Sequence, residues 1–131
     1  MTITPLYAAV LALMFIALSV RTLRLRRKHK VAVGDGGKPE LLRAMRVHAN
    51  FAEYTPMTLL LIYMLESMSG PSFVIHALCI CLVIGRISHA YGVSKLTENY
   101  RYRVFGMSMT FAALGLAAAG LLIFRTLNGV T

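Results

Sequence analysis

The chain has 131 residues, 57% of them hydrophobic and 15% charged, and its formal net charge at pH 7 is +9. A single domain of this length could not hide so much apolar surface in a soluble core, so the composition excludes an ordinary soluble fold and favours a bilayer. The basic residues lie between long apolar runs, which is typical of a membrane protein's cytoplasmic side and not of a nucleic-acid binder. No nucleic-acid partner is therefore expected.

The apolar runs predict an all-α membrane protein, a bundle of four transmembrane helices. The first run follows Pro5 and ends in the basic sequence RTLRLRRKHK, which fits a retained helix and not a cleaved signal peptide. Turn signals at 34–37 and at Gly70-Pro71 separate the next helices. The last run is rich in Ala and Gly, and its Gly115 and Gly120 are expected to serve helix packing. The expected helices cover residues 5–30, 39–69, 72–95 and 100–127.

The loops differ in charge in a way that predicts an orientation. Four spans place both termini on one side of the membrane. Most of the bases cluster within residues 21–46 and 86–103, around the connections after the first and third helices, whereas the connection SMSGPS carries none. The positive-inside rule therefore makes the two basic connections cytoplasmic and puts both termini on the other side.

The second helix carries polar residues that it cannot leave outside the membrane. Its apolar part, Phe51 to Leu65, has 15 residues, too few to cross about 30 Å at about 1.5 Å per residue. Asn50 and Glu53 must then lie in or near the membrane, where an ionised carboxylate costs about 2.5–3.5 kcal/mol at a helix centre. Arg46, Asn50 and Glu53 recur at i, i+4 and i+7, so they share one face of the helix.

Two interpretations of this face stay open on spacing alone. A zwitterionic, peptide-like ligand would place its carboxylates on Arg46 and its ammonium on Glu53. Alternatively, the charges pair with each other or with neighbouring helices. On the third helix Arg86 and His89 stand at i and i+3, and Arg86 by itself is more typical of an anchor at the membrane boundary. No spacing typical of a zinc site is present, and no metal is expected.

The segment RVHANFAEYTP resembles the second-helix signature of the membrane-associated proteins in eicosanoid and glutathione metabolism, the MAPEG family. That signature has Arg, Asn four residues later, then Glu, usually Tyr, and a Pro soon after. These places are filled by Arg46, Asn50, Glu53, Tyr54 and Pro56. VRTLRLRRK and GRISHAYG resemble the family's first and third helices. The short chain and the loop VAVGDGG resemble its small bacterial branch.

The resemblance implies a homotrimer in a bacterial inner membrane, with periplasmic termini. Glutathione would lie between subunits near the cytoplasmic side, where helices 1 and 2 of one protomer face helices 3 and 4 of the next. An Arg early in the fourth helix would stabilise the thiolate, and Arg101 and Arg103 are both candidates. Val93 departs from the family, many of whose members have Tyr at that place. Carried over position by position, the glutathione site would comprise Arg24, Arg46, His48, Asn50, Glu53, Tyr54, Arg86 and His89.

Three functions from different classes follow. The favoured one is a glutathione-dependent transferase or peroxidase, a detoxification enzyme that takes lipophilic electrophiles from the membrane lipid. The second is a non-catalytic family member that binds lipid or acts as a scaffold. The third is a small proton-coupled multidrug exporter in which Glu53 titrates. Arg46 and Asn50 on the same face count against the exporter, because a coupling carboxylate is usually left without a fixed cation.

Overall fold

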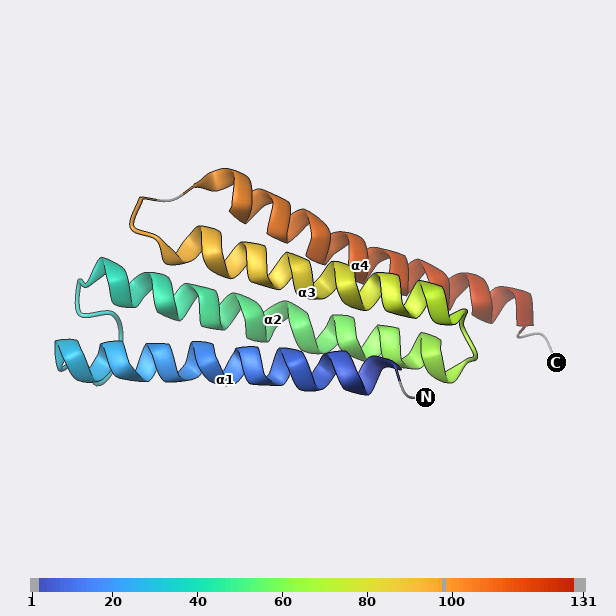
Figure 1. Cartoon of the computed structure of the whole chain (residues 1–131), viewed down its shortest axis with the longest axis horizontal. Helices are drawn as coiled ribbons and strands as arrows, with labels where there is room; N and C mark the ends of the chain where they lie inside the picture. The colour runs from blue at the N-terminus through green and yellow to red at the C-terminus, as the bar shows by residue number, and fades with distance from the viewer. Residues whose placement is uncertain (1–2, 98, 129–131) are drawn as a thin grey trace.

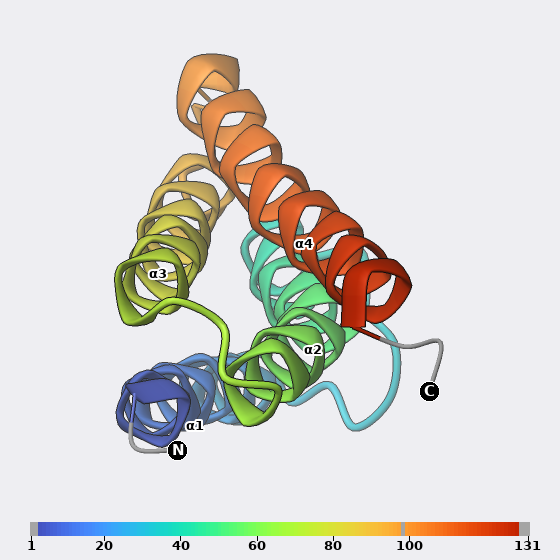
Figure 2. The same ribbon diagram turned by 90° about the vertical axis from the view of Figure 1, so that its right-hand side faces the viewer.

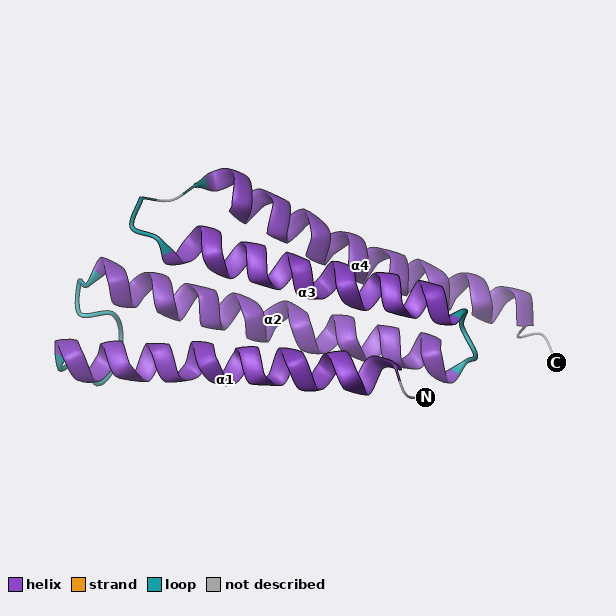
Figure 3. Cartoon of the chain, in the orientation of Figure 1, coloured by secondary structure: helices purple, strands orange, loops and turns teal. Residues whose placement is uncertain are grey.

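The structure, a computed structural model, describes residues 3–97 and 99–128 and contains four helices in an antiparallel bundle (Figure 1). All the described residues outside the helices form loops and turns (Figure 3). Every helix end lies within two residues of the end expected from the sequence, and the predicted all-α architecture is confirmed. The helices are α1 (Ile3–His29), α2 (Pro39–Ser67), α3 (Ser72–Ser94) and α4 (Tyr100–Asn128).

Three of the helices can cross a membrane by their own length and composition. They are α1, α3 and the stretch Tyr100–Phe124 of α4. In the described chain α2 does not meet that standard, because its first half carries Arg43, Arg46 and Glu53. It nevertheless packs against the other three helices, as α3 also does (Figure 2). Its polar half is therefore held among the spans of its neighbours.

Glycines bring α3 and α4 together at the end of the bundle that holds the α1–α2 loop and the α3–α4 link, called here the basic end. A Cβ on Gly106 would lie 2.5 Å from the backbone nitrogen of His89, and one on Gly92 would lie 2.7 Å from the backbone nitrogen of Arg103. Neither position can hold a larger residue without moving the backbone. By contrast, a Cβ on Gly115 would meet nothing within 4 Å in the protomer, so its packing role stays a prediction. Gly120 does pack, since its Cβ would lie 3.3 Å from Leu65.

The end of α2 is fixed by a Schellman motif. The N–H groups of Ser69 and Gly70 donate to the carbonyls of Glu66 and Leu65, at 3.0 Å each. Ser69 takes a left-handed φ of 62°, and Lys30, just after α1, takes 55° in an equivalent turn. Glycine normally fills this position because it has no Cβ to clash. The left-handed residue stops the helix, so α2 ends two residues before the predicted boundary.

The start of α1 is capped by another helix. The backbone N–H groups of Ile3 and Thr4 donate to the two carboxylate oxygens of Glu66, each at 2.9 Å. The first turn of a helix has no internal acceptors for these groups. Glu66 therefore ties the start of α1 to the last turn of α2, and Thr4 is buried there.

Candidate functional site

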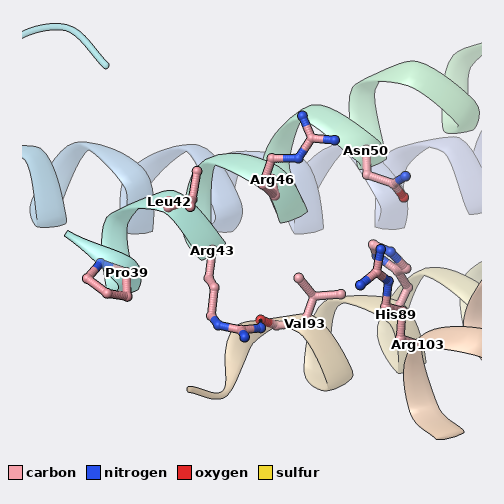
Figure 4. Close-up of a pocket in the computed structure, with 8 residues that line it drawn as sticks. All are labelled: Pro39, Leu42, Arg43, Arg46, Asn50, His89, Val93 and Arg103. Carbon is pink, nitrogen blue, oxygen red and sulfur yellow. Dashed lines mark hydrogen bonds between the residues drawn. The ribbon is translucent and has the colours of Figure 1, made fainter. Parts of the chain in front are cut away.

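A pocket of about 340 Å³ opens between α2, α3 and α4 near the basic end (Figure 4). Among its described lining residues three are arginines and none is a carboxylate. Such a surface has a positive potential and favours an anionic ligand. The lining residues are Pro39, Leu42, Arg43, Arg46 and Asn50 from α2, His89 and Val93 from α3, and Arg103 from α4.

The α2 wall follows from helical spacing. Arg43, Arg46 and Asn50 recur at i, i+3 and i+7, which places them along one side of the helix. Arg43 extends from α2 toward α3, where its Nη1 donates to the Val93 carbonyl at 3.2 Å (Figure 4). The sequence prediction began this stripe at Arg46 and missed Arg43, although the same spacing could have included it. The contact also caps the last turn of α3, which contains no base of its own.

A buried cation borders the pocket. Arg86 is 1% exposed, and its Nη1 donates to the Oδ1 of Asn50 at 2.8 Å and to the Asn50 carbonyl at 3.3 Å. Its Nη2 meets the sulfur of Met107 at 3.5 Å, and its Nε has no partner within the described structure. The acceptors that hold this guanidinium are neutral, so its positive charge adds to the potential of the pocket.

The structure separates the two arginines that were candidates for thiol activation. Both are exposed, but Arg103 lines the pocket and Arg101 does not. Residues two apart on a helix point about 200° apart, so one of the pair had to face away. His89, which is 5% exposed, completes this side of the pocket from α3.

Two of the predicted site residues turn toward other helices. The Nε2 of His48 lies 3.0 Å from the Ser19 hydroxyl, and its ring stacks on Phe15 with centroids 4.6 Å apart. Both partners belong to α1. The Tyr54 ring packs edge-to-face against Phe111 of α4, at 5.4 Å. Neither His48 nor Tyr54 lines the pocket.

Glu53 points outward, away from the pocket lining, and is exposed in the protomer. Arg46 is exposed as well, although it contributes to the pocket rim. Neither forms an ion pair within the described residues. The structure therefore does not contain the Arg46–Glu53 pair, which was one form of the structural interpretation.

Arg24 lies on α1 beside a separate hollow that also includes Glu40. Glu40 accepts hydrogen bonds from Lys28 at 3.1 Å and from His29 at 3.3 Å. Both bonds hold the pKa of the Glu40 carboxyl below its ordinary value, and the bond from Lys28 has the larger effect. In one protomer Arg24 is thus not part of the pocket.

The sequence model of the MAPEG family matches residues 4–123. The chain belongs to the MAPEG family. This confirms the resemblance seen in RVHANFAEYTP. The inner membrane protein YecN of Escherichia coli strain K12 is 38% identical over 112 residues, which cover 86% of this MAPEG chain and 84% of YecN. The protein of the same name from Escherichia coli O6:H1 matches with the same identity and coverage.

Proposed function

We propose that this MAPEG protein binds glutathione in the pocket between α2, α3 and α4 and uses it as a transferase or peroxidase on lipophilic electrophiles. The observation that carries the proposal is the pocket's described lining, which gathers three arginines next to a buried fourth. Glutathione brings two carboxylates and a thiol to such a surface. Family membership and the name of YecN support a place in a bacterial inner membrane.

The geometry suggests a role for each polar group in binding. Arg43 and Arg46 would hold ligand carboxylates by charge-assisted hydrogen bonds. The Oδ1 of Asn50 already accepts from Arg86, which leaves the Asn50 amide N–H groups to donate to the ligand. Arg86 would thus orient Asn50 and supply a fixed positive charge behind it.

Arg103 would act on the sulfur. A cation near a thiol favours the thiolate, which is the reactive nucleophile. The thiolate would attack an electrophilic carbon and form a thioether while the leaving group departs, which is chloride for a chlorinated aromatic compound. With a hydroperoxide, two glutathione molecules would be oxidised to the disulfide while the hydroperoxide is reduced to an alcohol and water.

Assembly into a homotrimer would complete the site. An exposed carboxylate such as Glu53 is costly against lipid, so its face of α2 needs protein or water beside it. A second copy would cover that face, and Glu53 could then meet the ligand ammonium from across the interface. Arg24, on the outer side of α1, could reach a neighbouring copy's pocket in the same way.

The test is glutathione titration of the purified protein, followed by assays with a hydroperoxide and a chlorinated aromatic compound. We expect Arg103→Ala to lower turnover by about 100-fold while weakening binding much less, because it removes a charge needed at the sulfur. Arg101→Ala, two residues away, is the matched control and should retain turnover. Absence of glutathione binding to the wild type would overturn the proposal. Binding without an ultraviolet thiolate signal would make the protein a non-catalytic member of the family.

One observation favours the exporter as a second candidate. Glu53 has no ion pair in the described part of the chain, and a proton-coupling carboxylate is usually left without a fixed cation. Proton-driven efflux of a cationic drug that is abolished by Glu53→Gln, in a protein that does not bind glutathione, would establish that function.

A further inference from the structure

A second groove, of about 320 Å³, lies between α3 and α4 on the side away from the anion pocket. Ile87 and Tyr91 stand two residues before and after the pocket residue His89, so they project from the opposite side of α3. The Ser88 hydroxyl donates to the Tyr102 carbonyl at 3.0 Å and joins the two helices here. The groove is lined by Ile84, Ile87, Ser88, Tyr91 and Tyr102.

Along this face of α3 the exposed side chains change from apolar to aromatic to cationic toward the basic end. Ile84 and Ile87 come first, Tyr91 follows, and Lys95 comes last, about 16 Å beyond Ile84. About 20 helical residues cross the hydrocarbon, so a span that begins at Ser72 reaches the interface near Tyr91. Tyrosine is typical of that level. The backbone of Lys95 then lies about 6 Å farther out, and its side chain reaches back to the level of Tyr91.

Lys95 is held in place by the aromatic residues of the groove. Its Nζ lies 2.5 Å from the Tyr91 hydroxyl and 4.2 Å from the centre of the Tyr91 ring. That ring packs edge-to-face against Tyr102, with centroids 5.1 Å apart. Across the described residues no carboxylate pairs with Lys95. A positioned cation therefore stands at the mouth of an apolar groove.

We infer that this groove, defined by Ile84, Ile87, Ser88, Tyr91, Tyr102 and Lys95, binds an anionic phospholipid of the leaflet at the basic end. An acyl chain lies along the two isoleucines, and the tyrosines meet the ester region. The phosphate accepts a hydrogen bond from Lys95. The apolar, aromatic and cationic groups follow one another along the groove in the same order as the acyl chain, ester region and phosphate of the lipid. The site is independent of glutathione binding.

The test compares phosphatidylglycerol with phosphatidylcholine of the same acyl chains, by native mass spectrometry of the delipidated protein. The wild type should bind phosphatidylglycerol several-fold more tightly. Lys95→Gln should weaken phosphatidylglycerol binding about five-fold and leave phosphatidylcholine unchanged, because one lysine near the membrane surface contributes that much to the binding of anionic lipid. Lys95→Arg should retain the preference. Ile87→Trp, which fills the groove with apolar bulk, should weaken both lipids.

Lys38→Gln is the matched control, because it removes one exposed charge from the loop at the same end of the bundle. It should leave lipid binding unchanged, and melting temperatures in detergent should show that every variant is folded. Equal losses of phosphatidylglycerol binding in Lys38→Gln and Lys95→Gln would mean that net charge alone attracts the lipid, and would overturn the proposed site. A wild type without preference would also overturn it, as would displacement of the lipid by inorganic phosphate.

Discussion

Burial of the Arg86 guanidinium costs free energy, which the packing of the rest of the bundle must offset. A buried cation is stable when it is paired and hydrogen-bonded, and here the strongest contact is with the neutral amide of Asn50. A carboxylate in that place would satisfy Arg86 better and would cancel its charge. The neutral partner keeps the site positive, which fits a pocket that binds anions.

Asn50→Asp tests this interpretation. The new carboxylate should accept from Arg86, so the melting temperature should be no lower than that of the wild type. Its negative charge should weaken glutathione binding by about ten-fold or more, because it repels the ligand carboxylates. Asn50→Ala is the contrast, since it removes the side-chain acceptor and should destabilise the protein by about 1–3 kcal/mol. Wild-type glutathione affinity in Asn50→Asp would contradict the placement of the ligand.

Arg46 offers a cleaner test of binding, because no charge in the described structure depends on it. Arg46→Ala should weaken glutathione binding about ten-fold to a hundred-fold, the loss of one charge-assisted contact of about 1.5–3 kcal/mol. Its melting temperature without ligand should stay unchanged. His76→Ala, at the other end of the bundle, should keep full affinity. If Arg46→Ala binds like the wild type, Arg46 has no role in the ligand site.

Among the helix ends, Ser69 is a place where the backbone is strained. A non-glycine residue in the left-handed region costs about 1–2 kcal/mol. Ser69→Gly should therefore raise stability by up to about 1 kcal/mol, measured as a higher melting temperature in detergent. Ser67→Gly, inside the last turn of α2, should lower stability by about 0.5–1 kcal/mol. If Ser69→Gly were less stable than Ser67→Gly, the Schellman motif would not define this helix end.

The cap on α1 predicts a local effect. Glu66→Gln leaves one accepting oxygen in place of two, so one of the N–H groups of Ile3 and Thr4 loses its partner. Hydrogen exchange in the first turn of α1 should speed up, while exchange near Arg21 at the other end of α1 should not change. Stability should fall by about 1 kcal/mol. Uniform acceleration along α1 would instead indicate general loosening of the bundle.

Sequence patterns predicted the helices well because apolar runs and turn residues act locally. They could not predict which way each side chain faces. Arg101 and Arg103 look equivalent in the sequence, and the packing of α4 decides between them. His48 lies inside the family motif yet turns to α1, since it is two residues from both Arg46 and Asn50 on the helix. Close helix contacts depend on partners from both helices, which is why Gly106 was missed.

The whole molecule has a charged end and a nearly neutral end. The bases at the end of α1, in the α1–α2 loop, in the first half of α2 and in the first turn of α4 lie together, while the α2–α3 loop is at the other end with the start of α1 and the end of α4 (Figure 1). Lys38→Cys and Ser69→Cys should therefore react with an impermeant thiol reagent from opposite sides. We expect Lys38→Cys to react from the cytoplasm and Ser69→Cys from the periplasm. Labelling of both from one side would contradict a four-span topology.

The contact between Glu66 and the start of α1 also sets an order of events during synthesis. The acceptor lies more than 60 residues after its donors, so the first turn of α1 has no protein partner until the ribosome has produced all of α2. The partners of this contact therefore all precede α3 in the sequence. The pocket also requires His89 and Arg103, which are made later. A growing chain thus holds the residues of its first helical hairpin before it holds those of the pocket.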